Sequence, residues 1–104
     1  MTTLTINSSL PLLKEKMVAD YSKAGFPEEM INKFADSISF SFGKKYIKVK
    51  FEHSVWGFLV NTSSDKKFSY GTILKPASYA SPARNFSRGN VLCLENVAVR
   101  WTSA

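Results

Sequence analysis

Cysteine and histidine are nearly absent from the chain, which has 104 residues and carries one of each, Cys93 and His53. A single cysteine excludes an intrachain disulfide, and one cysteine with one histidine supplies too few ligands for a zinc site. No spacing in the sequence links the two as a nucleophile and its base. We therefore interpret Cys93 as a small buried apolar residue and His53 as an exposed turn residue. We expect no enzymatic activity, no metal and no cofactor.

Acidic pairs, glycine-rich loops and long apolar runs are also lacking. The eight carboxylates are scattered, and the adjacent pair Glu28 and Glu29 suits the positive end of a helix better than a catalytic site. The five glycines are isolated, which excludes a phosphate-binding loop. No run approaches the roughly 20 apolar residues of a membrane-spanning helix. Residues 1–7 do not resemble a signal peptide, so we expect a cytoplasmic location without a membrane partner.

Helical periodicity occupies the first third of the chain. Ser8 or Ser9 suits an N-cap, Gly25 suits a left-handed C-cap, and Pro27 opens a second helix, so we expect a helical hairpin over residues 1–36. The first helix has an apolar stripe at three- and four-residue spacing, made of Leu10, Leu13, Met17, Tyr21 and Ala24. The second has a shorter apolar face, made of Met30, Ile31, Phe34 and Ala35.

From residue 37 onward polar and apolar residues alternate, which is typical of strands. Gly43 and Lys44 have the order of a two-residue type II′ turn, and this turn would pair Phe40 with Ile47. Because directly opposed residues share a face, such a hairpin carries its apolar side chains on one side. The other side then presents a polar and basic set, made of Ser39, Ser41, Tyr46, Lys48 and Lys50.

A third strand over 54–61 has apolar residues on both faces, which predicts a central position in the sheet. Its alternation predicts a shared face for Trp56, Phe58 and Val60. A short strand at 73–75 ends at Pro76, and a last hairpin is expected from 90–94 and 97–101. Core packing is the expected role of five aromatic residues, Trp56, Phe58, Phe68, Tyr70 and Trp101.

Together these elements predict one α+β domain over residues 1–104, consistent with 44% hydrophobic and 13% aromatic residues. A helical hairpin over 1–36 precedes an antiparallel sheet of five or six strands over 37–104. A small SH3-like barrel is the first expectation, and an open sheet packed on the helices is the alternative.

Positive charge is concentrated in the β half. Residues 1–42 have a net charge of −1, whereas residues 43–104 have ten Lys and Arg residues against three acids, a net charge of +7. Such asymmetry favours a polyanionic partner, with solubility as the alternative explanation. Lysines along a strand suit a nucleic-acid backbone, and Tyr46 could stack on a base. The expected nucleic-acid contacts are Lys44, Lys45, Tyr46, Lys48, Lys50, Arg84, Arg88 and Arg100.

A 13-residue loop over 76–88 is unusually long for a compact domain, and such loops are often functional. Its arginines and serines suit phosphate, and its two aromatic rings suit an unpaired base. The alternative is an Ω-loop whose aromatic rings pack into the core. We expect further partner contacts from this loop, by Ser78, Tyr79, Asn85 and Phe86.

Six short segments occur in a distinctive order: KYIKV at 45–49, SVWGF at 54–58, GTILKPAS at 71–78, PARN at 82–85, RGN at 88–90 and RWT at 100–102. This order resembles a set of short, functionally uncharacterised proteins encoded by tailed bacteriophages. The resemblance covers about residues 38–102. It implies a phage origin and action in the cytoplasm of a bacterial host, and it gives no mechanism.

Three functions are compatible with these observations. The first is nucleic-acid binding through the basic β half. The second is binding and modulation of a bacterial host protein, as in host takeover or resistance to a bacterial defence, through the long loop and an exposed aromatic residue. The third is a role in the virion or its assembly, which would require self-association.

Overall fold

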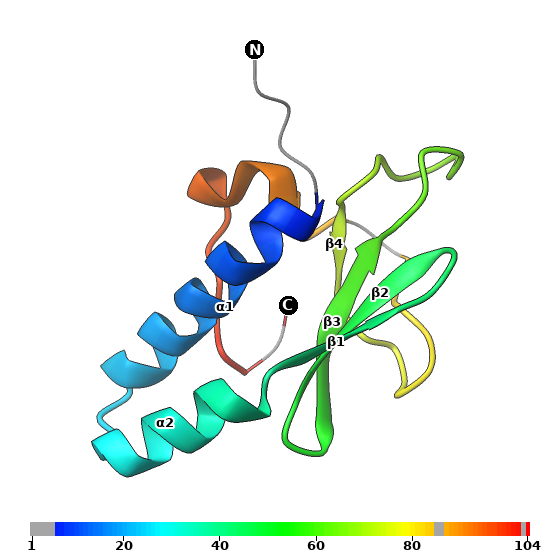
Figure 1. The fold of residues 1–104 in the computed structure, drawn as a ribbon. Helices are drawn as coiled ribbons and strands as arrows, with labels where there is room; N and C mark the ends of the chain where they lie inside the picture. Colours follow the sequence, from blue (N-terminus) through cyan, green and yellow to red (C-terminus); the bar gives the residue numbers. More distant parts are fainter. Residues whose placement is uncertain (1–5, 85–86, 103) are drawn as a thin grey trace.

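The computed structural model describes residues 6–84, 87–102 and 104. It has an α+β fold in which two helices precede a four-stranded antiparallel sheet and a short 3₁₀ helix (Figure 1). The elements are α1 (Ile6–Lys23), α2 (Glu28–Ser37), β1 (Ser39–Phe42), β2 (Tyr46–Phe51), β3 (Ser54–Val60), β4 (Ile73–Leu74) and η1 (Val91–Asn96).

The helical hairpin is confirmed, with differences in its details. α1 begins at Ile6, ahead of the expected serine cap, and Gly25 adopts a left-handed φ of +88° after the helix ends. The expected burial of Ala24 is wrong because this residue follows the last helical turn and is exposed. Met30 is exposed too, because α2 packs mainly through Phe34, the one fully buried residue of that helix.

The β1–β2 hairpin keeps the predicted faces in a register shifted by two residues. Phe40 lies opposite Val49 instead of Ile47, and the Gly43 N–H donates to the Tyr46 carbonyl oxygen at 2.9 Å. The turn is therefore Lys44–Lys45, and the expected Gly43–Lys44 turn is wrong. A shift of two residues preserves the side of every side chain, since the strand period is two. Both lysines of the turn are exposed.

β3 lies between β2 and β4, which confirms its predicted central position. A bulge interrupts its pairing with β2: Val49 faces Gly57 and Lys50 faces Val55, so Trp56 is the extra residue. The bulge turns Trp56 into the main core, whereas Phe58 belongs to a second cluster. The prediction that these two side chains share a face is therefore wrong.

The expected hairpin over 90–94 and 97–101 is wrong. Residues 91–96 form η1, two short 3₁₀ turns that meet at a kink at Cys93, and the Asn90 side chain caps the first turn by accepting from the Leu92 N–H at 2.8 Å. Cys93 is exposed at this kink instead of buried in a strand. Five or six strands and an SH3-like barrel are not confirmed, because the described residues form one sheet in the order β1-β2-β3-β4.

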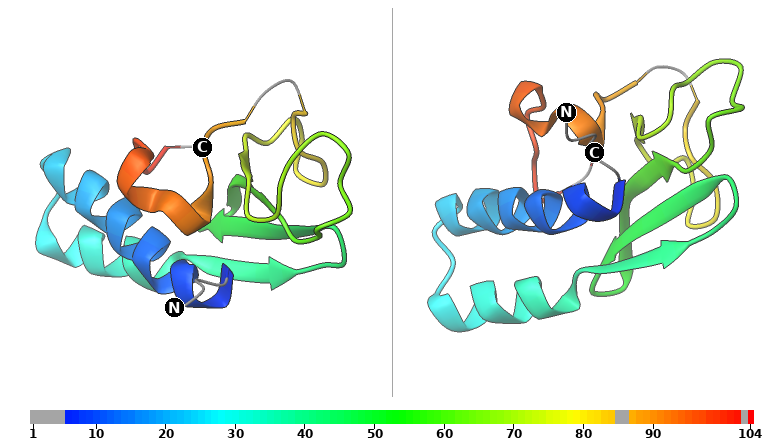
Figure 2. Two further views of the ribbon diagram at one scale, coloured as in Figure 1. Left: turned by 90° about the horizontal axis from the view of Figure 1, so that it is seen from above. Right: turned by 45° about the horizontal axis from the view of Figure 1, so that its top comes forward.

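The two faces of the sheet have different coverings. The helices and the C-terminal segment cover one face, and the loops that follow β3 and β4 lie on the other (Figure 2). The main core joins α1 and α2 to the sheet, and a ring cluster within it unites Tyr21, Phe34 and Trp101, with Tyr21 and Phe34 stacked at 4.2 Å between centroids. The smaller cluster on the loop side contains Phe58, Val60, Phe68 and Leu74.

Of the five aromatic residues expected in the core, Trp56, Phe58 and Phe68 are buried, Trp101 is half-buried and Tyr70 is exposed.

Candidate nucleic-acid interface

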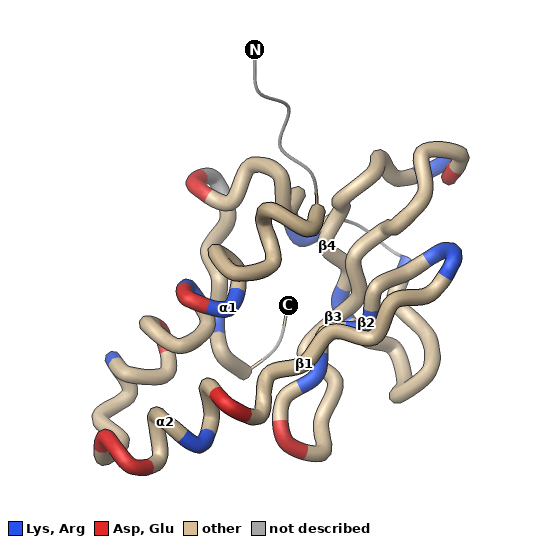
Figure 3. Tube along the Cα trace, viewed as in Figure 1, with Lys and Arg blue, Asp and Glu red and all other residues tan. Residues whose placement is uncertain are grey.

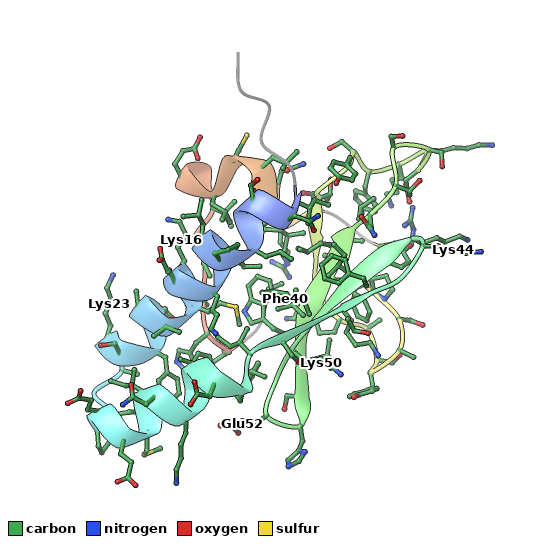
Figure 4. All side chains as sticks on the ribbon, viewed as in Figure 1. Lys16, Lys23, Phe40, Lys44, Lys50 and Glu52 are labelled. Atoms are coloured by element: carbon green, nitrogen blue, oxygen red, sulfur yellow. The ribbon has the colours of Figure 1, made fainter. Side chains whose placement is uncertain are left out.

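The lysines of the β1–β2 hairpin lie on its outer face. Lys44 and Lys45 are exposed at the turn, and Lys48 and Lys50 are half-buried farther along β2. Figure 3 shows the positive charge of the turn at the free end of the hairpin, well away from the acidic residues of α2, whereas Figure 4 places Lys50 toward the other end of β2. Figure 4 places Lys44 at that end and Phe40 on the opposite side of the sheet, where it packs on the main core.

Tyr46 lies between these lysines and is tied to its neighbours. Its ring meets Phe58 edge to face at 6.0 Å between centroids, and its hydroxyl accepts a hydrogen bond from Arg84 Nη1 at 2.6 Å. The side chain is half-buried. Tyr46 therefore helps to hold the covering loops on the sheet, and its ring is poorly placed for the stacking role expected from the sequence.

Arg84 and Asp65 join the two loops that cover this face. The guanidinium donates through Nη1 and Nη2 to the two carboxylate oxygens, each at 2.9 Å. Asp65 also accepts the backbone N–H groups of Phe68 and Lys67. The hydrogen bond from Arg84, followed by these two N–H groups, lowers the pKa of Asp65 well below its usual value, and Asp65 in turn raises the pKa of Arg84.

Local sequence patterns do not predict this ion pair, because Asp65 and Arg84 are 19 residues apart. The local feature that accompanies the ion pair is an Asx-turn, in which the Asp65 side chain accepts the N–H of Lys67. The carboxylate of Asp65 compensates the positive charge of Arg84. Lys67 belongs to the same junction, because its ammonium donates to the Arg84 carbonyl oxygen at 2.6 Å.

The loop after β4 carries an exposed aromatic ring, whereas the ring of Tyr46 is half-buried. Tyr79 is 60% exposed, and Lys48 Nζ lies 4.2 Å from its ring centroid. Ser78 is exposed, and its hydroxyl accepts the Ala80 N–H at 3.4 Å within the turn. The expected contacts Asn85 and Phe86 lie outside the described residues.

Two shallow hollows lie on either side of Lys45 and Tyr46, which line both of them. One, of about 300 Å³, extends along the hairpin toward Lys48, Phe42 and Ala80. The other, of about 400 Å³, extends toward the ion pair and is also lined by Thr62, Ser64, Asp65 and Arg84. We call this surface, from Lys48 and Tyr79 through Lys45 to Ser64, the hairpin track.

Arg88 and Arg100 do not join the hairpin track. They line a separate cleft of about 560 Å³ with Lys75, and this cleft shares no lining residue with either hollow. Its floor includes Trp56 and Ile73, which belong to the core on the helix side of the sheet. The basic residues expected to form one patch are therefore divided between two places.

Comparison with known proteins gives no relative: the chain matches no protein-family model, no curated protein and no solved structure. Among the described residues, no three His, Cys, Asp or Glu side chains are grouped so that they could hold a metal ion. No helix within the described ranges is long and apolar enough to cross a membrane.

Proposed function

We propose that this protein binds single-stranded nucleic acid, with little sequence preference, along the hairpin track. The observation that supports the proposal is the position of Lys45 and Tyr46 between the two hollows, with Lys44 and Lys48 beside them. A flexible backbone could follow both hollows past these ammonium groups. Lysine ammonium groups neutralise phosphates without reading bases, which accounts for weak sequence preference.

Tyr79 supports the choice of single-stranded over double-stranded nucleic acid. Its ring is the most exposed aromatic surface among the described residues, and the Lys48 ammonium lies against it. An unpaired base can stack on such a ring beside a cation, whereas a paired base presents only its edges. The resemblance to short phage proteins fits a role in the cytoplasm of an infected bacterium.

A salt series tests the proposal. Binding of a fluorescent 20-nucleotide dT strand, followed by anisotropy, should weaken steeply as salt rises. The triple variant Lys44→Gln, Lys45→Gln and Lys48→Gln should lower the slope of log K against log salt by about 2, from about 0.7 per lost phosphate contact. No binding at low salt would rule the proposal out, and preference for a duplex of equal length would reject the single-stranded form.

The matched control removes three lysines from the helices: Lys16→Gln, Lys23→Gln and Lys33→Gln. All three lysines are exposed on the helices, away from the hairpin track. Their replacement lowers the net charge by the same three units as the hairpin variant. The control should keep the slope of the unmodified protein. Equal losses in both triple variants would show attraction to overall charge instead of a located interface.

The second candidate function is binding of a bacterial host protein through the same surface. The specific observation in its favour is the exposure of two large rings, Tyr79 at 60% and Phe42 at 58%. Aromatic side chains often dominate protein interfaces. A host protein recovered from nuclease-treated lysate at one-to-one ratio, and lost with Tyr79→Ala, would favour this candidate over nucleic acid.

A further inference from the structure

The cleft away from the hairpin track is a second collection of positive side chains. Three of its lining residues are basic, Lys75, Arg88 and Arg100. Two hydroxyl side chains, Ser87 and Thr102, also line it. Basic and hydroxyl groups of this kind are the donors with which proteins bind phosphate.

The fold brings these residues together from three distant parts of the chain. Lys75 directly follows β4, and the segment with Arg88 runs beside that strand, because the Arg88 N–H donates to the Ile73 carbonyl oxygen at 2.8 Å. The Ile73 N–H donates in turn to the Gly89 carbonyl oxygen at 2.8 Å. The backbone of 88–89 is thus fixed to the edge of the sheet.

Arg100 is held at the other wall of the cleft. The buried Trp56 indole N–H donates to the Arg100 carbonyl oxygen at 2.6 Å, and the Trp101 N–H donates to Asp20 at 2.9 Å. The backbone on both sides of the Arg100 side chain is therefore anchored while the side chain itself is exposed. A fixed backbone below an exposed cationic side chain suits repeated binding of an anion.

We propose that this cleft binds a phosphate-bearing ligand, a di- or triphosphate group in particular. Its volume of about 560 Å³ is that of a small-molecule site. Lys75 and Arg100 supply two positive charges for such a group. The polyphosphate could belong to a free nucleotide, and a terminal phosphate of a nucleic acid would offer the same chemistry. The site is independent of the hairpin track and does not require the function proposed above.

Calorimetric titration with inorganic pyrophosphate and with ATP, without divalent cation and at low salt, tests the site. Both ligands should bind saturably, and the double variant Lys75→Gln with Arg100→Gln should weaken binding at least about tenfold, since charge-assisted hydrogen bonds to phosphate are lost. The charge-retaining variant Lys75→Arg with Arg100→Lys should keep most of the pyrophosphate affinity of the unmodified protein. Absence of saturable pyrophosphate binding would overturn the proposal.

The matched control is Lys44→Gln with Lys45→Gln, which removes the same charge from the hairpin track. It should leave pyrophosphate affinity unchanged and weaken the binding of dT instead, so failure of one site is distinguishable from failure of the other. Equal weakening of pyrophosphate binding by both double variants would also overturn the proposal.

Two further probes identify the source of the phosphate. A 10-nucleotide dT strand with a 5′-phosphate is compared with the same strand carrying a 5′-hydroxyl. If the Lys75 and Arg100 variant weakens the phosphorylated strand as well as pyrophosphate, and leaves the 5′-hydroxyl strand unchanged, the cleft binds a nucleic-acid end. If it weakens pyrophosphate and ATP but neither strand, the cleft binds a free polyphosphate.

Discussion

Arg84 donates two hydrogen bonds of 2.9 Å to Asp65, and the same guanidinium donates to the Tyr46 hydroxyl at 2.6 Å. One arginine thereby joins the loop after β3, the loop after β4 and strand β2. On the face of the sheet that the helices leave open, Phe68 of the loop after β3 packs in one cluster with Phe58 of the sheet. The hairpin track lies over this junction, so its shape depends on an ion pair within the protein.

Removal of the carboxylate charge at Asp65 should loosen this junction in a pH-dependent way. The pKa of Asp65 is lower in the folded protein than the usual value of about 3.9 in an unfolded chain. The carboxylate therefore contributes its full stabilisation above that value and loses it as the pH falls toward the folded pKa. Asp65→Asn should lower Tm at neutral pH.

The difference in Tm between the unmodified protein and Asp65→Asn should stay constant from pH 7 to about 5 and narrow below about 4. Thermal melts followed by circular dichroism over that pH range measure it. The matched control is Asp36→Asn, an exposed carboxylate on α2. A difference that grew on acidification would contradict the assigned role of Asp65.

Tyr46 and Tyr79 should respond differently to substitution. Tyr79→Ala should weaken binding of a dT strand about five- to a hundredfold, the usual range for loss of one stacked base. Tyr46→Phe removes only the hydroxyl that accepts from Arg84, and should leave binding within about twofold while costing about 1 kcal/mol of stability. Anisotropy titrations and urea denaturation of both variants make the comparison.

The opposite pattern, with affinity lost in Tyr46→Phe and retained in Tyr79→Ala, would restore the role that the sequence suggested for Tyr46. It would also argue against stacking on the exposed ring beside Lys48.

Gly57 should not accept a larger side chain. A Cβ at this position would lie 2.8 Å from the Leu74 carbonyl oxygen and 2.8 Å from the Ala104 Cβ, closer than real contacts allow. Because the first neighbour is backbone of the adjacent strand, β3 and β4 would have to separate. Gly57→Ala should cost about 1–3 kcal/mol in urea denaturation. Ser41→Ala, at an exposed position of β1, should change stability by less than about 0.5 kcal/mol.

The helical hairpin and the faces of the β1–β2 hairpin could be predicted because both follow from local periodicity. Gly25, for example, marks the end of α1 through a backbone conformation that other residues rarely adopt. The register of the β hairpin could not be predicted with the same certainty, since a shift of two residues leaves every side chain on its side. Alternation fixed the faces and left Gly43 free to pair with Tyr46.

The bulge and the ion pair depend on contacts that local patterns do not contain. β3 is apolar on both faces, so hydrophobicity gives no sign that Trp56 is turned to the face opposite Phe58. Asp65 and Arg84 are 19 residues apart and meet only after both loops fold over the sheet. Arg84 lies at the hairpin track, whereas Arg88 and Arg100 line the cleft. This division also depends on contacts between residues that are far apart in the sequence.

Cys93 offers a direct test of the C-terminal part of the fold. Had residues 90–94 formed a strand, the thiol would be expected in the core, whereas on η1 it is exposed. The native protein should therefore react with one equivalent of Ellman's reagent at a rate within about tenfold of the urea-unfolded chain, since access controls such reactions.

A buried thiol would react only through unfolding, and its rate would follow the stability of variants such as Gly57→Ala. Equal labelling rates in the unmodified protein and in Gly57→Ala would confirm exposure. A rate that rises with destabilisation would contradict the 3₁₀ helix at 91–96.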